Sequence, residues 1–282
     1  MKNIPKEKVV FLSAITSDIG IALAKRYSRD GYTVVGTYRS NALLNELAGL
    51  PNLHLFYCDL NNKKTIKDSV SKFSALELRW ETFISCAAWP LPLTKFFDSD
   101  FEEWSKSVDV NAIAQLCVLY SLYPFRREDL ITNAVFFAGP GTNNAVKNFS
   151  ALTVSKIMLI KMCELLNAEN DDLNIFVVGP GWTKTKTHKF ILSDPHVSDE
   201  KYKETLNFLQ NQEGTSLDDI YDCIRWLCIQ GKHISGGRNF SVVHDVWGKA
   251  ELAKELLKDI NMYKLRRHRN DWRDKGDKNY ER

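Results

Sequence analysis

Residues Ala134-Val-Phe-Phe-Ala-Gly-Pro-Gly141 are followed by a polar loop and by an amphipathic segment that starts near Phe149-Ser150 and carries Lys156. The apolar run has the length of a strand and is closed by glycine and proline, which predicts a strand buried on both faces. After Ser150, apolar residues recur at spacings of three and four, as on one face of a helix. The stretch therefore predicts one strand–loop–helix unit.

The same unit recurs along the chain. Further strands are expected at residues 8–14, 32–38, 53–57, 82–85 and 174–178, with helices between them, the longest over residues 100–122. Strands that alternate with helices are typical of an α/β protein with a Rossmann-type, doubly wound parallel sheet, which is a three-layer α/β/α sandwich. Such sheets bind ligands at the carboxyl ends of their strands, so we expect the functional site there.

Length and linker composition predict the domain organisation. A chain of 282 residues can bury a large core. Because no Ser/Gly/Pro-rich linker or low-complexity run interrupts the alternating pattern, we expect one domain over residues 1–246, followed by a C-terminal helix and basic tail over residues 247–282.

The charge of the chain is close to neutral, with a formal net charge of +3, which argues against a nucleic-acid-binding surface. The excess lies at the end, where residues 264–282 hold eight Lys/Arg against four Asp/Glu, together with Trp272 and Tyr280. Two interpretations of this tail stay open: a contact for an anionic surface or RNA, and a solvated or partner-packed terminus.

Cysteine usage and hydropathy favour a cytoplasmic protein. The six cysteines form no C-x-x-C pair and have no metal-ligand spacing, so we expect free thiols in a reducing compartment and no metal site. The first apolar run leads into Thr16-Ser-Asp18 instead of a small-residue cleavage site, and no apolar run has the length of a membrane span. We therefore predict a cytoplasmic protein without a membrane partner.

The first strand–helix turn and the end of the second strand are candidate nucleotide contacts. The turn Ser13-Ala-Ile-Thr-Ser-Asp-Ile-Gly20 lies where a helix start would favour a phosphate, although it keeps a single glycine. Arg39 follows the second strand, where it would meet the 2′-phosphate of NADP, and no acidic residue stands there to bind a free ribose hydroxyl. The alternative for Arg39 is an ordinary surface arginine.

Taken in order, these residues resemble the short-chain dehydrogenase/reductase family over roughly residues 8–245. Ser13 to Gly20 stand where that family has Thr-Gly-x-x-x-Gly-x-Gly, with Ala14 and Asp18 in place of two glycines. Ser155-Lys156 match the end of its Tyr-x-x-x-Lys pair, and Asn111 matches its catalytic asparagine. The resemblance implies a dinucleotide, with NADP(H) preferred over NAD(H) because of Arg39. The cofactor-binding residues that it implies are Ser13, Thr16, Asp18, Ile19, Gly20, Arg39, Asp59, Leu60, Ala87, Lys156, Pro180, Gly181, Thr183 and Thr185.

The departures from the family concern the reacting groups. Leu152 stands where the family has its proton-donating tyrosine, and Gly139 or Ala138 stands at its serine position. Neither replacement can donate a proton. A missing general acid costs roughly 10² to 10⁴ in rate, and a missing oxyanion donor costs roughly 10² to 10³. The resemblance leaves Asn111 and Lys156 as catalytic residues; Thr142, Thr153 and His188 are weaker candidates for a replacement acid.

Two functions follow from this resemblance. The first is an NAD(P)(H)-dependent oxidoreductase acting on an unidentified carbonyl or hydroxyl substrate, with a sugar or sugar nucleotide among the candidates. The alternative is an impaired or inactive protein of the same fold that binds a dinucleotide or a protein partner. The basic stretch at residues 182–189 would suit an anionic substrate, or is a solvated turn. By analogy with the family, we expect a homodimer or homotetramer formed by the helices at residues 100–122 and 150–167.

Overall fold

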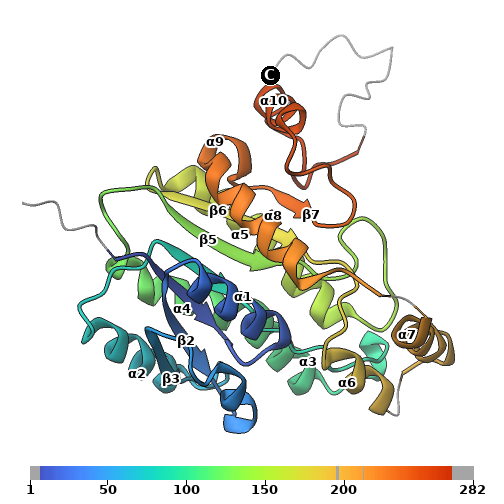
Figure 1. Cartoon of the computed structure of the whole chain (residues 1–282). Helices are drawn as coiled ribbons and strands as arrows, with labels where there is room; N and C mark the ends of the chain where they lie inside the picture. Colours follow the sequence, from blue (N-terminus) through green and yellow to red (C-terminus); the bar gives the residue numbers. More distant parts are fainter. Residues whose placement is uncertain (1–6, 195–196, 212, 269–282) are drawn as a thin grey trace, which may run out of the picture.

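The computed structural model describes residues 7–194, 197–211 and 213–268. Seven strands form one parallel sheet in the order β3-β2-β1-β4-β5-β6-β7 (Figure 1). Their bounds are β1 Val9–Ser13, β2 Thr33–Tyr38, β3 Leu53–Tyr57, β4 Thr82–Ser85, β5 Thr132–Phe137, β6 Leu173–Gly179 and β7 Asn239–Ser241. The chain order reverses between β1 and β4, which places the topological switch point, and hence the ligand crevice, at the carboxyl ends of these two strands.

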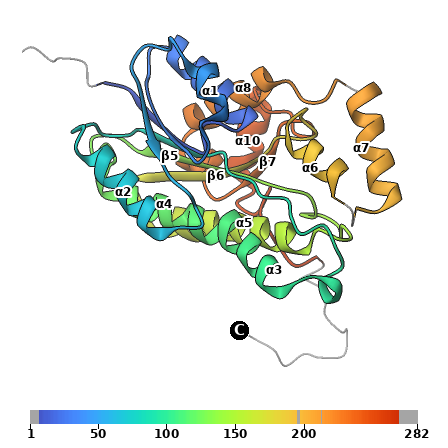
Figure 2. The same cartoon turned by 90° about the horizontal axis from the view of Figure 1, so that it is seen from below.

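Helices cover both faces of the sheet, as Figure 2 shows. One face carries α1, α8 and α10, and the other carries α2, α4 and α5. The helices are α1 Asp18–Arg29, α2 Lys63–Ser74, α3 Phe101–Val108, α4 Ala114–Leu122, α5 Ser150–Glu169, α6 Thr187–Ser193, α7 Asp199–Asn211, α8 Leu217–Gln230, α9 Lys232–Ser235 and α10 Ala250–Lys258. Short helical turns are η1 Asn41–Leu47, η2 Phe96–Asp98, η3 Asp109–Ile113 and η4 Tyr123–Phe125. The predicted three-layer α/β/α sandwich is confirmed.

The core follows from the two-residue period of the strands. In β1, Val10 and Leu12 pack against α1 and α8, whereas Val9 and Phe11 pack against α2 and α4 on the other face. Because every residue of β1 is buried, the strand is apolar from Val9 to Leu12, and the buried Ser13 ends it. The strand predicted from Ala134 is β5, which begins two residues earlier, at Thr132.

The helix expected over residues 100–122 is interrupted. It consists of α3, the π-helical turn η3 and α4, and η3 contains Asn111. Taken together, these elements and η4 form the helical stretch Phe101–Phe125, which among the described residues is the one long and apolar enough to cross a membrane. Its buried residues belong to the core beneath the sheet, where α4 packs against α2, so we interpret it as a core helix.

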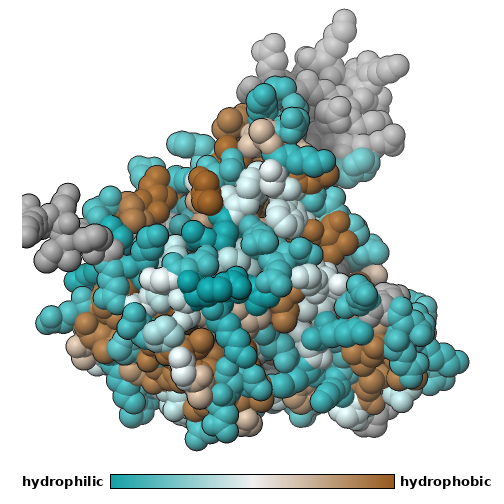
Figure 3. All heavy atoms as spheres, in the orientation of Figure 1, coloured by the Kyte–Doolittle hydropathy of each residue, from teal (hydrophilic) through white to brown (hydrophobic). Residues whose placement is uncertain are grey.

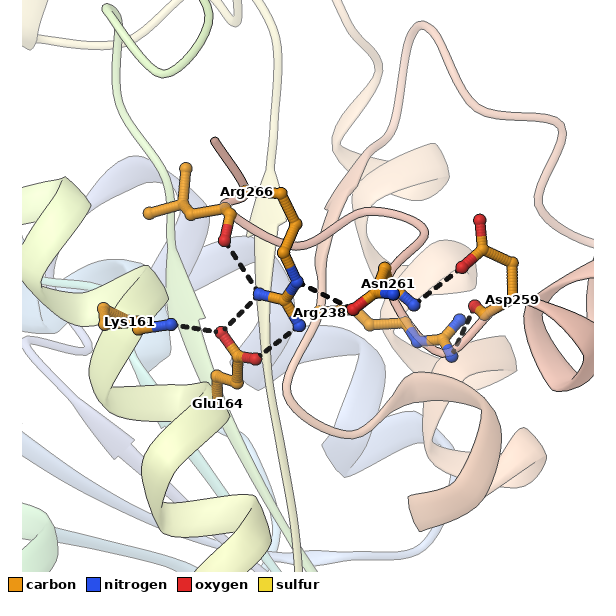
Figure 4. Close-up of polar contacts among 7 residues, drawn as sticks. Lys161, Glu164, Arg238, Asp259, Asn261 and Arg266 are labelled. Carbon is orange, nitrogen blue, oxygen red and sulfur yellow. Dashed lines mark hydrogen bonds and ion pairs between the residues drawn. The ribbon is translucent and has the colours of Figure 1, made fainter. Parts of the chain in front are cut away.

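The chain after α10 is fastened to α5 by the contacts drawn in Figure 4. Arg266 holds both carboxylate oxygens of Glu164, at 2.7 and 3.1 Å, and its Nε donates to Asn261. The pKa of Glu164 is lowered to about 2, mainly by the hydrogen bond from Arg266. Buried Arg238 donates to the Leu256 carbonyl at 2.7 Å, which caps the end of α10. The predicted boundary at residue 246 stays a prediction, and residues 269–282 of the basic tail lie outside the described residues.

Candidate active site

The turn between β1 and α1 is built tightly around Gly20. Ser17 caps α1, its hydroxyl accepting the Gly20 N–H at 3.0 Å. A Cβ atom on Gly20 would lie 2.6 Å from the Ile15 carbonyl oxygen, so no other residue fits without moving the helix. Ala14, at the first glycine position of the family motif, has a φ of 56°, a left-handed conformation that costs about 1–2 kcal/mol for a residue with a Cβ atom. The turn is therefore closely packed at Gly20 and strained at Ala14, where the family motif has a glycine.

Asp18 links this turn to the loop after β6. Its Oδ2 accepts the backbone N–H of Lys186 at 2.8 Å. The predicted residues Pro180, Gly181, Thr183 and Thr185 lie in the same loop, which is thereby joined to the start of α1. Gly181 has a φ of 73°, and a Cβ atom there would lie 2.5 Å from the Thr215 hydroxyl.

Arg39 follows β2, and Asp59 and Leu60 follow β3, at the edge of the sheet where the resemblance implies adenosine contacts. Arg39 is exposed, and its guanidinium carbon lies 5.4 Å from the centre of the Trp89 ring. Because Trp89 follows β4 and Arg39 follows β2, this contact spans the carboxyl end of β1. Asp59 Oδ1 accepts the backbone N–H of Asn61 at 3.0 Å. The sequence analysis did not identify Trp89, for which the only signal was an aromatic residue shortly after a predicted strand.

Asn111 is fully buried and clamps the loop after β4. Its Oδ1 accepts the Trp89 N–H at 2.8 Å, and its Nδ2 donates to the Trp89 carbonyl at 2.7 Å and to Ser107 Oγ at 3.2 Å. Gln115, which the sequence analysis missed, donates to the Ala87 carbonyl at 3.1 Å and accepts from Ser85 Oγ at 2.7 Å. The side chain of Asn111 thus positions the loop that carries Ala87 and Trp89, and a catalytic part for it stays a prediction.

Lys156 of α5 is a buried amine. Its side chain is 3 % exposed, and its Nζ has no hydrogen-bond partner among the described residues. Burial lowers the pKa of Lys156 to about 8 because it disfavours the charged ammonium. Burial likewise raises the pKa of the Cys86 thiol to about 12, and the nearby Lys156 charge opposes that rise. An orphaned amine at this position fits the hydroxyl groups of a nucleotide ribose.

The structure brings Leu152, Gly139 and Lys156 together, as the resemblance implies. A Cβ atom on Gly139 would lie 2.9 Å from Lys156 Cγ and 3.8 Å from Leu152 Cγ. Ala138 instead faces Gly179, since its Cβ atom is 3.8 Å from where a Cβ of Gly179 would be. Of the two candidates for the serine position, Gly139 is therefore the one beside Leu152 and Lys156, and both Leu152 and Gly139 present only hydrocarbon there.

Apolar side chains surround Leu152. It packs with Leu93 from the loop after β4, Phe149 at the start of α5 and Ile191 of α6 into a buried cluster, which we call the Leu152 cluster. In it Leu152 is 8 % exposed and Leu93 is 2 % exposed. The place where a substrate would meet a proton donor is thus filled by the protein's own side chains.

His188 and Thr153 are engaged in contacts with the backbone of nearby loops. His188 is buried, its Nε2 lies 2.9 Å from the Thr183 carbonyl, and its ring stacks on Trp182. Burial lowers the pKa of His188, which favours the neutral ring at neutral pH. Thr153 donates to the Pro140 carbonyl at 3.2 Å. Through these contacts, His188 and Thr153 hold the backbone of the loops at Thr183 and Pro140 in place.

A hollow of about 580 Å³ lies between the loop after β6, α7 and α8. Its walls include Trp182, Glu204, Asp219 and His244. Lys201 of α7 lies 4.4 Å from the centre of the Trp182 ring, so the aromatic head of the basic stretch is part of the wall. Within the described residues, no group of three or more His, Cys, Asp or Glu is placed to hold a metal ion.

The known proteins that this chain resembles are dehydrogenases and reductases. A family model described as Enoyl-(Acyl carrier protein) reductase matches residues 14–242. The mitochondrial dehydrogenase/reductase SDR family member 2 of Homo sapiens is 24 % identical over 253 residues, covering 86 % of this chain and 87 % of that protein. A Saccharomyces cerevisiae short-chain dehydrogenase/reductase superposes with a TM-score of 0.75 at 20 % identity, covering 88 % of this chain and 98 % of that one. An actinorhodin polyketide ketoreductase solved with NADPH gives 0.70 at 18 % identity, covering 84 % and 95 %.

Proposed function

This chain belongs to the short-chain dehydrogenase/reductase family, and we propose that it is an oxidoreductase that binds a nicotinamide dinucleotide, NADP(H) in preference to NAD(H). The observation that carries the proposal is the buried, unpartnered amine of Lys156 at the carboxyl edge of the sheet. When bound, the dinucleotide would supply or accept a hydride. The chain's own part is to hold it, with Lys156 at the ribose and Arg39 at the 2′-phosphate.

The altered proton transfer is the second part of the proposal. With Leu152 and Gly139 unable to donate, we propose the ammonium of Lys156 as the proton donor, because the stem of this side chain lies beside both residues. Its pKa of about 8 keeps most of the amine protonated at neutral pH, yet makes it a far stronger acid than an ordinary lysine. A reduction that uses this proton slows as the pH rises through 8, because the ammonium form is then lost.

We propose a small carbonyl or hydroxyl compound as substrate. A sugar or a sugar nucleotide suits the hollow beside the loop after β6, where asparagine, threonine, carboxylate and imidazole groups can bond to hydroxyls. Glu204 and Asp219 in the same wall count against the anionic substrate that the basic stretch favoured, and that expectation stays a prediction.

We also propose a homodimer or homotetramer. On the α1 and α8 side, hydrophilic side chains dominate and apolar ones lie in scattered patches (Figure 3). On the opposite side, Tyr120 of α4 is 83 % exposed, and Val154, Met158 and Leu165 are exposed along one side of α5. An apolar surface on two adjacent family helices supports self-association, and analytical ultracentrifugation of the purified chain measures it. A cytoplasmic location stays part of the proposal.

The alternative function is a dinucleotide-binding protein without turnover. The Leu152 cluster favours it, because four buried apolar side chains occupy the place of the proton donor and substrate. The two functions share the binding step and differ in the chemistry that follows.

Titration with NADPH and with NADH tests the shared step. We expect a saturable quenching of tryptophan fluorescence and a lower Kd for NADPH. The absence of a saturable signal at millimolar concentrations of either dinucleotide would remove both functions. Single-turnover oxidation of bound NADPH with a panel of aldehydes then separates the enzyme from the binding protein.

A further inference from the structure

The first turn of α1 contains a carboxylate of the protein itself, that of Asp18. Asp18 is the first residue of this 12-residue helix, and its side chain is half-buried. Its Oδ2 accepts the Lys186 N–H at 2.8 Å, so the carboxylate is held in place. The family motif has a glycine at this position, where the backbone alone would face a ligand.

The helix start is also where the pyrophosphate of a dinucleotide would lie. The N-terminal end of a helix carries a partial positive charge and N–H groups that suit an anion. The Asp18 carboxylate, fixed in the first turn of α1, is itself an anion at this helix start. It places a negative charge beside the position where the phosphates of a dinucleotide would bind. The ribose position at Lys156 fits a dinucleotide, whereas the phosphate position is in conflict with it.

The same carboxylate joins elements that lie far apart in the sheet. Lys186 belongs to the loop after β6, whereas Asp18 follows β1, and β4 and β5 lie between these strands. The hydrogen bond therefore crosses the carboxyl edge of the sheet at the crevice. A dinucleotide would have to share or displace this contact in order to lie along the edge.

We propose that Asp18 is the residue that limits dinucleotide affinity: its carboxylate acts as a built-in substitute for a phosphate and opposes the pyrophosphate. This inference rests on the proposed dinucleotide function and deepens it. Ligands that reach Arg39 without placing a phosphate at α1, such as adenosine 2′-monophosphate, are not opposed in this way.

Two variants separate the charge of Asp18 from its hydrogen bond. Asp18→Asn removes the charge but retains a side-chain oxygen for the Lys186 N–H, and Asp18→Gly removes both. Asp171→Asn is the matched control, because Asp171 is an exposed carboxylate just before β6, at the opposite edge of the sheet. Circular dichroism and thermal melting check that each variant is folded.

Calorimetric titrations with NADPH and with adenosine 2′-monophosphate are then compared. We expect both Asp18 variants to bind NADPH about tenfold more tightly than the natural chain, as one like-charge contact near a surface would give. Affinity for adenosine 2′-monophosphate is expected to stay unchanged, and Asp171→Asn to match the natural chain with both ligands. The gain is expected to shrink at high salt, because salt screens the repulsion.

The inference fails if Asp18→Asn binds NADPH no more tightly than the natural chain does. A gain confined to Asp18→Gly would also overturn it, because the hydrogen bond and not the charge would then be the obstacle. If no folded variant binds either ligand, the proposed dinucleotide function itself fails, and the inference falls with it.

Discussion

Lys156 and Leu152 lie one turn apart in α5, yet their surroundings are opposite. Lys156, at the proposed ribose contact, keeps a buried amine that no group among the described residues satisfies. Leu152, at the proposed position of the proton donor, packs into an apolar cluster. A buried amine is costly for a fold, whereas a buried leucine stabilises it. The difference shows that a titratable amine persists at residue 156, whereas residue 152 carries no group that can transfer a proton.

The strongest test of this comparison is to restore the acid. Leu152→Tyr places a phenol one helical turn from Lys156, and we expect NADPH-dependent reduction of benzaldehyde or 2,3-butanedione to rise by about 10² or more. Leu152→Phe is the matched control, since it adds the ring without the hydroxyl. Equal rates for the two variants would show that leucine is not the main defect.

A serine at the neighbouring position refines the same test. Gly139→Ser puts a hydroxyl beside residues 152 and 156, although its Cβ atom requires Lys156 to shift, whereas Ala138→Ser points toward Gly179. In the Leu152→Tyr background, we expect a further gain from Gly139→Ser and none from Ala138→Ser. The reverse order would contradict the assignment of Gly139 to the serine position.

The buried amine itself is tested by stability as a function of pH. The pKa of Lys156 is about 8 in the folded chain and near 10.5 when unfolded, so between these values the unfolded chain binds more protons. The contribution of Lys156 to the free energy of unfolding should therefore rise with pH across this window, by about 3 kcal/mol in all, whereas the buried thiols, whose pKa values are raised, act in the opposite direction. Lys156→Met should lose that rise and be the more stable protein at pH 7.

Urea denaturation at pH 7, 9 and 10.5 measures this difference. Lys72→Met, which alters an exposed lysine of α2, is the control and should keep the pH dependence of the natural chain. If the difference in stability between the natural chain and Lys156→Met does not change with pH over this range, Lys156 is not buried as an amine. The same Lys156→Met variant should also weaken dinucleotide binding if the amine holds the ribose.

The smallest expected effect concerns the adenosine end. Arg39→Ala should lower the affinity for NADPH about tenfold, because one exposed charge-assisted contact with the 2′-phosphate is lost. The affinity for NADH, which has no 2′-phosphate, should stay unchanged. Arg29→Ala is a matched control, since Arg29 is an exposed arginine at the far end of α1. Equal losses for NADPH and NADH would remove the claim of NADP preference. If Arg39→Ala instead bound both NADPH and NADH more tightly, the contact between Arg39 and Trp89 would obstruct the crevice.

Much of the fold could be predicted because its signals are local. A strand, or a turn at Gly20 or Pro180-Gly181, is indicated by a few neighbouring residues. The strands β3 and β4 accordingly have the predicted bounds. The π-helical turn at Asn111 could not be predicted, because hydrophobic spacing alone is typical of one continuous helix. The contacts of Asn111 there are with the backbone of Trp89, 22 residues away.

The chain's own residue types determined the layered α/β architecture, the tight turn at Gly20 and the apolar character of residues 139 and 152, because backbone preference and chemical identity are carried by each residue itself. The order of the strands established the rest: the contact between Asp18 and the loop after β6, the contact between Arg39 and Trp89, and the burial of Lys156. Each of these depends on which distant segments meet at the carboxyl edge of the sheet, and burial alone accounts for the lowered pKa of Lys156.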